Sequence, residues 1–90
     1  MLEGSVNVVN QLGLHARAAA QLVRVAGKFR SRITLRRTDS DTSANAKSIL
    51  SLLALAAPVG TQLLIEADGH DEDEALRSVM DLFAGGFGEI

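Results

Sequence analysis

The chain has 90 residues, of which 47% are hydrophobic, with a formal net charge of −2 and a pI near 5.5. This length fits one globular domain over residues 1–90 and excludes a second independent core. The lack of cysteine excludes disulfides, thiol nucleophiles and cysteine metal sites, and it is compatible with a cytoplasmic protein. The weak acidity argues against a general nucleic-acid binder, and the longest mostly apolar run, residues 49–59, is too short to span a membrane.

Charge is distributed unevenly along the chain. Seven of the nine basic residues lie between Arg17 and Arg37, and eight of the eleven acidic residues lie from Glu66 onward. Two interpretations are open. The asymmetry describes either two solvated faces packed back to back, or a basic docking face around His15 for an acidic partner.

The N-terminal part of the sequence predicts a strand, a turn and a helix. Residues 6–9 favour a strand, residues 10–13 favour a turn, and the alanine-rich segment from Ala16 onward favours a helix. His15 is therefore expected near the N-cap of that helix, with Arg17 in the first turn. Because a helix start offers unpartnered N–H groups and the positive end of the macrodipole, it favours a bound anion.

The pair His15 and Arg17 suits a phosphate carried on histidine. A neutral imidazole is a nucleophile near physiological pH, and the arginine adds a permanent cation with a planar donor fork. The positive surroundings favour the neutral ring before transfer and the phosphate after it. The alternative is a surface N-cap histidine beside a solvated arginine, with no chemical role.

The middle of the chain predicts a hairpin and a second helix. Residues 32–36 alternate polar and apolar, which indicates a half-buried strand, and the turn formers of residues 38–42 join it to a short partner. Residues 44–55 favour a helix that begins near Asn45 or Ala46 and weakens before Pro58. Ser48 is then expected in the first turns of this helix.

The last third predicts a strand and a helix. Over residues 61–67 the alternation turns Leu63, Ile65 and Ala67 inward, and residues 71–83 carry apolar side chains at helical spacing. Asp71 and Glu74 resemble a capping box, and the helix is expected to end before Gly85. The order β-α-β-β-α-β-α indicates an α+β fold, an open-faced sandwich in which helices cover one face of the sheet.

The chain resembles the HPr family, the histidine-containing phosphocarrier proteins of the phosphoenolpyruvate-dependent phosphotransferase system. The resemblance spans nearly the whole chain and is carried by three landmarks in order: Leu12-Gly13-Leu14-His15-Ala16-Arg17, then Ala46-Lys47-Ser48-Ile49-Leu50, then Gly69 before the acidic start of the last helix.

The resemblance implies a four-stranded antiparallel sheet covered by helices. It implies that His15 is phosphorylated on Nδ1 by phosphorylated Enzyme I, that Arg17 stabilises the phosphate, and that the phosphate passes to an Enzyme IIA domain. Such a chain is a substrate of its partners rather than an enzyme, and we expect a cytoplasmic monomer without metal, cofactor, nucleic-acid or membrane partner.

Three further expectations follow from the resemblance. In many members the serine at the position of Ser48 is phosphorylated by a dedicated kinase, the HPr kinase/phosphorylase. The family usually has proline where this chain has Ala18. The alanine restores the backbone N–H donor that proline lacks, and it makes the loop at the start of the helix less rigid. The ending from Leu82 to Phe87 is similar to the nitrogen-related branch of the family, but the choice between sugar uptake and a regulatory relay stays open.

The leucine-rich segment predicts a docking surface near His15, because one short helix cannot hide so many leucines. Its apolar centre is expected from Leu14 and three residues of the second helix, with basic residues including Arg17 at its rim. The other candidates are Ile49, Leu50 and Leu53 at the centre and Arg24 and Lys47 at the rim. By resemblance, Leu50 and Leu53 are the members for which exposure is most expected.

Two other classes of protein remain as alternatives. A ligand-binding or metal-binding regulatory module could use His15 with His70, although two distant histidines make a weak metal site. An interaction module could bind RNA on the open sheet, but this usually needs aromatic stacking residues in strands. The chain has only Phe29, Phe83 and Phe87, and none lies in a predicted strand.

Overall fold

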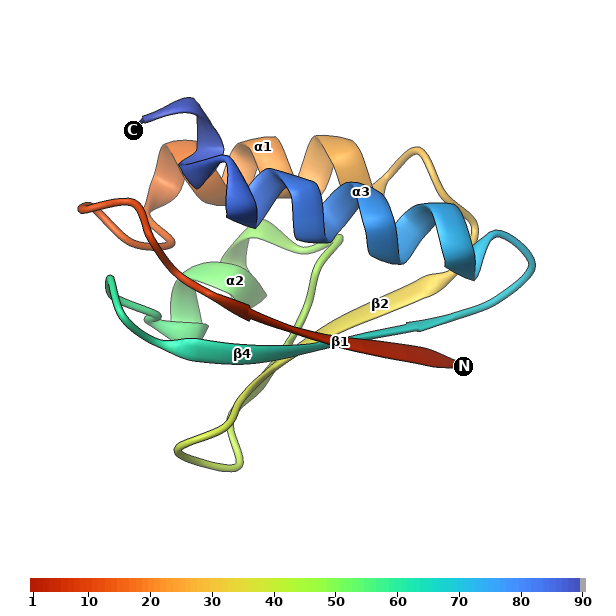
Figure 1. The fold of residues 1–90 in the computed structure, drawn as a ribbon, viewed down its shortest axis with the longest axis horizontal. Helices are drawn as coiled ribbons and strands as arrows, with labels where there is room; N and C mark the ends of the chain where they lie inside the picture. The colour runs from red at the N-terminus through yellow and green to blue at the C-terminus, as the bar shows by residue number, and fades with distance from the viewer. Residues whose placement is uncertain (90) are drawn as a thin grey trace.

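The computed structural model describes residues 1–89 and shows a sheet covered by helices (Figure 1). The elements are β1 (Leu2–Asn7), α1 (Ala16–Ala26), β2 (Arg32–Arg37), β3 (Ser43–Asn45), α2 (Ile49–Leu55), β4 (Gln62–Asp68), α3 (Glu72–Ala84) and the 3₁₀ turn η1 (Gly86–Gly88). The predicted order of strands and helices is confirmed, and η1 is added at the end. Over the described residues no helix has the length and apolar character needed to cross a bilayer.

The four strands form one antiparallel sheet in the order β1-β4-β2-β3. Alternate side chains of its two central strands are fully buried beneath the helices, as the alternation predicts. These side chains are Ile33 and Leu35 of β2 and Leu63, Ile65 and Ala67 of β4. The helices complete the core with Leu22, Leu52, Leu55, Val79 and Phe83. The open-faced α+β sandwich is therefore confirmed, with the opposite face of the sheet left to solvent.

The first strand begins earlier than predicted. It covers Leu2–Asn7 rather than residues 6–9, although Gly4 and Ser5 have low strand propensity. Pairing with β4 along six residue positions overrides that propensity. Val8 is buried but lies beyond the strand, where its N–H donates to the Thr61 carbonyl at 2.9 Å.

The second helix is shorter than predicted, and Ser48 is its N-cap rather than a residue of its first turns. Ala44 and Asn45 pair with β2 as the strand β3, and the Ala46 N–H donates to the Ile33 carbonyl at 2.9 Å. Sheet pairing takes these residues away from the helix that their propensity favours. The correction places Ser48 at the junction between the hairpin and α2.

The predicted capping box at the start of α3 is wrong. Asp71 is the N-cap residue, but its side chain makes no capping hydrogen bond. Its carboxylate instead accepts from the backbone N–H groups of Arg30 and Ser31, both at 2.9 Å, and from the Ser31 hydroxyl at 2.5 Å. Asp71 therefore joins the turn after α1 to the turn before α3.

The charge asymmetry does not produce two opposed faces. On the open face of the sheet β2 and β4 are neighbours, and Arg36 pairs with Glu66 at 3.1 Å. On the helical side, α1 carries Arg17 and Arg24, while the first turn of α3 is acidic. Basic and acidic residues therefore meet within each face.

Candidate functional site

His15 is the N-cap of α1, as predicted. Its backbone is extended, with φ −84° and ψ −176°, and its carbonyl accepts from the Ala19 N–H at 2.8 Å. Its side chain makes no capping hydrogen bond. Because the first-turn N–H groups of a helix have no intrahelical acceptor, α1 opens on donors that are available to an anion.

The loop before His15 is fixed by contacts with the segment that follows α2. Gly13 has φ +68°, and a Cβ placed there would lie 2.6 Å from the Ala57 carbonyl oxygen. The next residue, Leu14, donates its N–H to the same carbonyl at 2.9 Å. The left-handed glycine therefore allows a close backbone approach that sets where the imidazole begins.

Glu89 contacts the imidazole, and sequence reasoning missed it. Its Oε2 lies 2.5 Å from His15 Nε2, and its Oε1 accepts from Asn10 Nδ2 at 3.1 Å. The same Asn10 amide donates to the Gly13 carbonyl at 2.7 Å, so it links the carboxylate to the loop. The pKa of Glu89 is lowered, mainly by the hydrogen bond from His15 and then by that from Asn10, so the carboxylate is ionised at neutral pH.

The turn η1 brings Glu89 back to the start of α1. Gly86, Phe87 and Gly88 have φ values of 60°, 56° and 77°, a left-handed run that reverses the chain. Phe87 is buried and packs edge-on against Phe83, with ring centroids 4.9 Å apart. The signal in the sequence was the glycine-rich stretch around one aromatic residue, followed by an acid. The ring therefore lies beside a carboxylate as well as the helix start and Arg17, and the carboxylate was not predicted.

Arg17 is exposed in the first turn of α1. The ion pairs within residues 1–89 do not include it, but it lies near enough to help lower the pKa of Glu89. Its guanidinium is thus placed beside the helix start, where a permanent cation would offset the charge of a phosphate.

An apolar surface lies next to His15. A shallow cavity of about 220 Å³ is lined by Leu12, Leu14, His15, Ala56, Ala57 and Pro58. Leu12 is exposed at its edge, and α2 exposes Ile49, Leu50 and Leu53. Leu14 is 4% exposed and belongs to the core, so its predicted place on the docking surface is wrong.

The predicted rim residues Lys47 and Arg24 both lie away from His15. The Lys47 ammonium donates to the Phe29 carbonyl at 2.7 Å, just beyond the C-terminal end of α1. Since α1 has 11 residues, this end lies about 16 Å from its start. Lys47 is therefore exposed but distant from His15. Arg24 is exposed in the last turn of α1, on the same helical face as Arg17.

Ser48 caps α2 through its side chain, whose Oγ accepts from the Ser51 N–H at 3.3 Å. The capping role considered from the sequence is confirmed. Whether this serine is also modified stays a prediction.

His15 and His70, the pair considered for a metal or ligand site, lie far apart in the structure. His70 lies in the turn between β4 and α3, which is at the opposite end of the molecule from the start of α1 (Figure 1). Over residues 1–89 no cluster of three or more potential metal-ligating side chains forms. Phe83 and Phe87 are buried, so they cannot stack with bases on the open face of the sheet.

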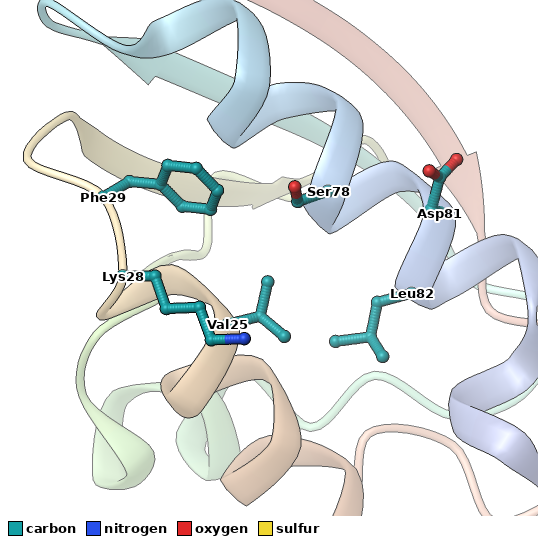
Figure 2. A pocket seen from close by; sticks show the side chains of 6 residues that line it. All are labelled: Val25, Lys28, Phe29, Ser78, Asp81 and Leu82. Atoms are coloured by element: carbon teal, nitrogen blue, oxygen red, sulfur yellow. The ribbon is translucent and has the colours of Figure 1, made fainter.

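A second cavity of about 420 Å³ lies between α1 and α3 (Figure 2). Val25 and Leu82 point into it from the two helices, with Lys28 and Asp81 at its sides. It is lined by Val25, Lys28, Phe29, Ser78, Asp81 and Leu82. None of these is a predicted site residue, so this cavity is separate from the histidine site.

Comparisons with known proteins agree with this geometry. A family model described as the PTS HPr component phosphorylation site matches residues 2–85. The phosphocarrier protein HPr of Neisseria meningitidis serogroup A is 45% identical over 99% of this chain and 98% of its own length. The phosphocarrier protein NPr of Escherichia coli K12 is 41% identical over 94% of this chain and 93% of its own length. The crystal structure of HPr-C-His from Thermoanaerobacter tengcongensis has a TM-score of 0.92 at 38% identity and covers 100% of this chain and 99% of that one.

These matches place the chain in a class of small phosphotransferase-system proteins that contain a phosphorylation site. The chain belongs to the HPr family of phosphocarrier proteins. Its relatives include both HPr and NPr, the nitrogen-related branch.

Proposed function

We propose that this chain is a single-domain phosphocarrier in which Nδ1 of His15 accepts a phosphoryl group from phosphorylated Enzyme I and passes it to an Enzyme IIA domain. The observation that carries the proposal is an imidazole held at the open N-terminus of α1, with Arg17 in the same turn. Family membership supports it independently.

The site suits a group that must arrive and leave. Phosphoryl transfer depends on positioning and charge stabilisation, which the first-turn N–H groups and Arg17 supply without enclosing the phosphate. The His15 side chain is 26% exposed, so two successive partners can reach it. A deep pocket would hold the phosphate too firmly for a carrier.

The partners dock on an apolar surface made of Leu12, Ile49, Leu50 and Leu53, which we call the docking surface. These side chains are exposed and lie on α2 and on the loop before His15. Arg17 and Arg24 extend it along α1 and suit acidic partners.

Incubation with phosphoenolpyruvate and Enzyme I tests the proposal. We expect an acid-labile phosphate on the protein, lost in His15→Ala and retained in His70→Ala, the matched histidine control. Labelling that persists in His15→Ala would contradict the assignment. A protein that binds an Enzyme IIA domain but is never labelled would instead be a non-catalytic regulatory or ligand-binding module.

Ser48 is a proposed regulatory site, phosphorylated by an HPr kinase/phosphorylase. Added negative charge beside the docking surface would weaken binding of an acidic or phosphorylated partner. Ser48→Asp should therefore slow acceptance from Enzyme I, while Ser48→Ala should not. Equal rates for both variants would show that the electrostatic argument is wrong.

The proposed setting is a cytoplasmic monomer, in sugar uptake or in a regulatory relay. Competing phosphoryl donors decide the branch. Faster labelling by the Enzyme I of the sugar pathway would place the chain there, and faster labelling by its nitrogen-related counterpart would place it in regulation.

A further inference from the structure

Glu89 occupies a built position rather than a surface contact. It is 74 positions from His15 in sequence, its side chain is 13% exposed, and both of its oxygens accept hydrogen bonds. Oε2 faces His15 Nε2 at 2.5 Å and Oε1 accepts from Asn10 at 3.1 Å. The carboxylate is therefore held at both ends in one orientation.

Two energetically unfavourable features accompany this position of Glu89. Phe87 adopts φ +56°, in the left-handed region that side chains other than glycine rarely enter. Asn10 is fully buried, and its Oδ1 has no hydrogen-bond partner within residues 1–89. The burial of Phe87 offsets the strained turn, while the amide of Asn10 is used to place Gly13 and Glu89. Both costs are tolerated where they bring a carboxylate to the imidazole.

We propose that Glu89 is a positioning residue that holds His15 as its Nε2–H tautomer and so directs the phosphoryl group to Nδ1; the inference rests on the phosphocarrier function proposed above. An ionised carboxylate can only accept a hydrogen bond, so Nε2 must be the donor. A neutral imidazole carries one ring proton, and its available lone pair is then on Nδ1.

Glu89 also compensates charge during the reaction. The Nδ1 lone pair forms the N–P bond while the bond from phosphorus to the donor breaks, and that electron pair leaves with the donor. The ring becomes a cation that keeps its Nε2 proton opposite the Glu89 carboxylate. When the phosphoryl group moves on, the N–P pair returns to Nδ1 and the ring is neutral again. The arrangement is like the orienting carboxylate of a serine protease triad.

NMR of the ¹⁵N-labelled imidazole tests the tautomer without any partner protein. Above the pH range of imidazole titration, we expect the neutral His15 ring of the wild type to be the Nε2–H form. Glu89→Ala should give a mixture of both tautomers. Glu74→Ala removes an exposed acid of α3 and is the matched control. A wild-type ring in the Nδ1–H form would overturn the proposal even if Glu89→Ala failed to fold.

The position of a chemically added phosphate gives a second readout. Phosphoramidate transfers its phosphoryl group to imidazole as its own P–N bond breaks and ammonia leaves. We expect phosphate on Nδ1 alone in the wild type and Glu74→Ala, and on both nitrogens in Glu89→Ala. Identical products in all variants would overturn the inference.

Enzyme I separates this inference from the proposed function. Glu89→Ala should accept phosphate from it roughly ten- to a hundredfold more slowly, the factor that a hydrogen bond to a charged group is worth. An unchanged rate would overturn the role of Glu89 in transfer. If Enzyme I does not label the wild type while the tautomer and phosphoramidate results hold, the proposed function fails and the control of the ring by Glu89 stands.

Discussion

At the scale of single residues, two carboxylates join distant parts of the chain. Glu89 joins the segment after α3 to His15, and Asp71 joins the turn before β2 to the turn before α3. Neither role is visible in the sequence, because each side chain contacts a residue far away along the chain. Glu89 is 74 positions from His15, and Asp71 is 40 positions from Ser31. Both should be detected by removing the carboxylate.

Asp71 should make stability depend on acid pH. Its hydrogen bonds, led by that from the Ser31 hydroxyl, lower its pKa from 3.8 to about 2. Because the folded pKa lies below the ordinary value, Asp71 stabilises the fold above about pH 4, and this contribution is lost as the pH falls toward 2. Asp71→Ala should therefore be less stable than the wild type at pH 7, with a smaller difference near pH 2, measured by urea unfolding. Asp73→Ala, in the same exposed turn, should leave the pH profile nearly unchanged.

Gly13 should be more sensitive to substitution than another left-handed glycine. A Cβ on Gly60 meets nothing within 4 Å, so Gly60→Ala should cost about 1–2 kcal/mol, for the backbone conformation alone. At Gly13 the Cβ would lie 2.6 Å from the Ala57 carbonyl oxygen, so Gly13→Ala should cost a further ~1–3 kcal/mol. It should also slow phosphorylation of His15 by moving the loop. Equal unfolding free energies for the two variants would contradict this account of the loop.

At the scale of elements, α2 divides its leucines between the core and the docking surface. Leu50 is 77% exposed, whereas Leu52 is fully buried. Period and propensity predicted a helix rich in leucine here, and the resemblance selected Leu50 and Leu53 as the exposed pair. Both are exposed in the structure, but Ile49 is as exposed as Leu53, Leu14 lies in the core, and Lys47 reaches the far end of α1.

Leu50→Glu should impair docking of Enzyme I without unfolding the protein. Exposed positions usually change the unfolding free energy by less than about 0.5 kcal/mol, while the added charge should raise the KM for this chain roughly tenfold. The neighbouring variant Leu52→Ala should instead cost about 2–5 kcal/mol and leave docking by the folded fraction intact. Unfolding by Leu50→Glu would place that side chain in the core and remove it from the docking surface.

The sequence predicts local structure well, but it does not predict the long-range contacts that override local preferences. The alternation in β2 and β4 and the helix that follows His15 were correct, because burial and propensity agree there. The bounds of α2 were wrong, because residues 44–45 gain more from pairing with β2 than from helix formation. Asp71 failed as a capping box for the same kind of reason: Ser31, distant in sequence, competes for its carboxylate.

The candidate site was predictable only in part. His15 and Arg17 share one turn of helix, so their arrangement follows from local spacing. Glu89 depends on a left-handed turn with a non-glycine residue at its centre, which no propensity favours. Its contact with the ring follows from the packing of Phe87 against Phe83 rather than from a motif.

At the scale of the whole molecule, a net negative chain presents a basic helix face. Arg17 and Arg24 are exposed and seven positions apart, so they lie along one face of α1, and Lys28 is exposed in the turn that follows the helix. Arg32 and Arg36 lie on the open face of the sheet, where β4 contributes acids. Only the α1 face combines basic residues with the site, so it should attract acidic partners over distances near the Debye length.

Phosphoryl transfer from Enzyme I should therefore slow as salt increases. Between about 20 mM and 300 mM salt, kcat/KM for the wild type should fall roughly tenfold, because screening weakens the steering of charged partners. The double variant Arg24→Gln with Lys28→Gln should start lower and depend less on salt. Arg32→Gln with Arg36→Gln removes the same charge from the other face and should keep the wild-type slope. Since both double variants change the net charge equally, equal slopes would show that net charge, rather than the basic face of α1, controls association.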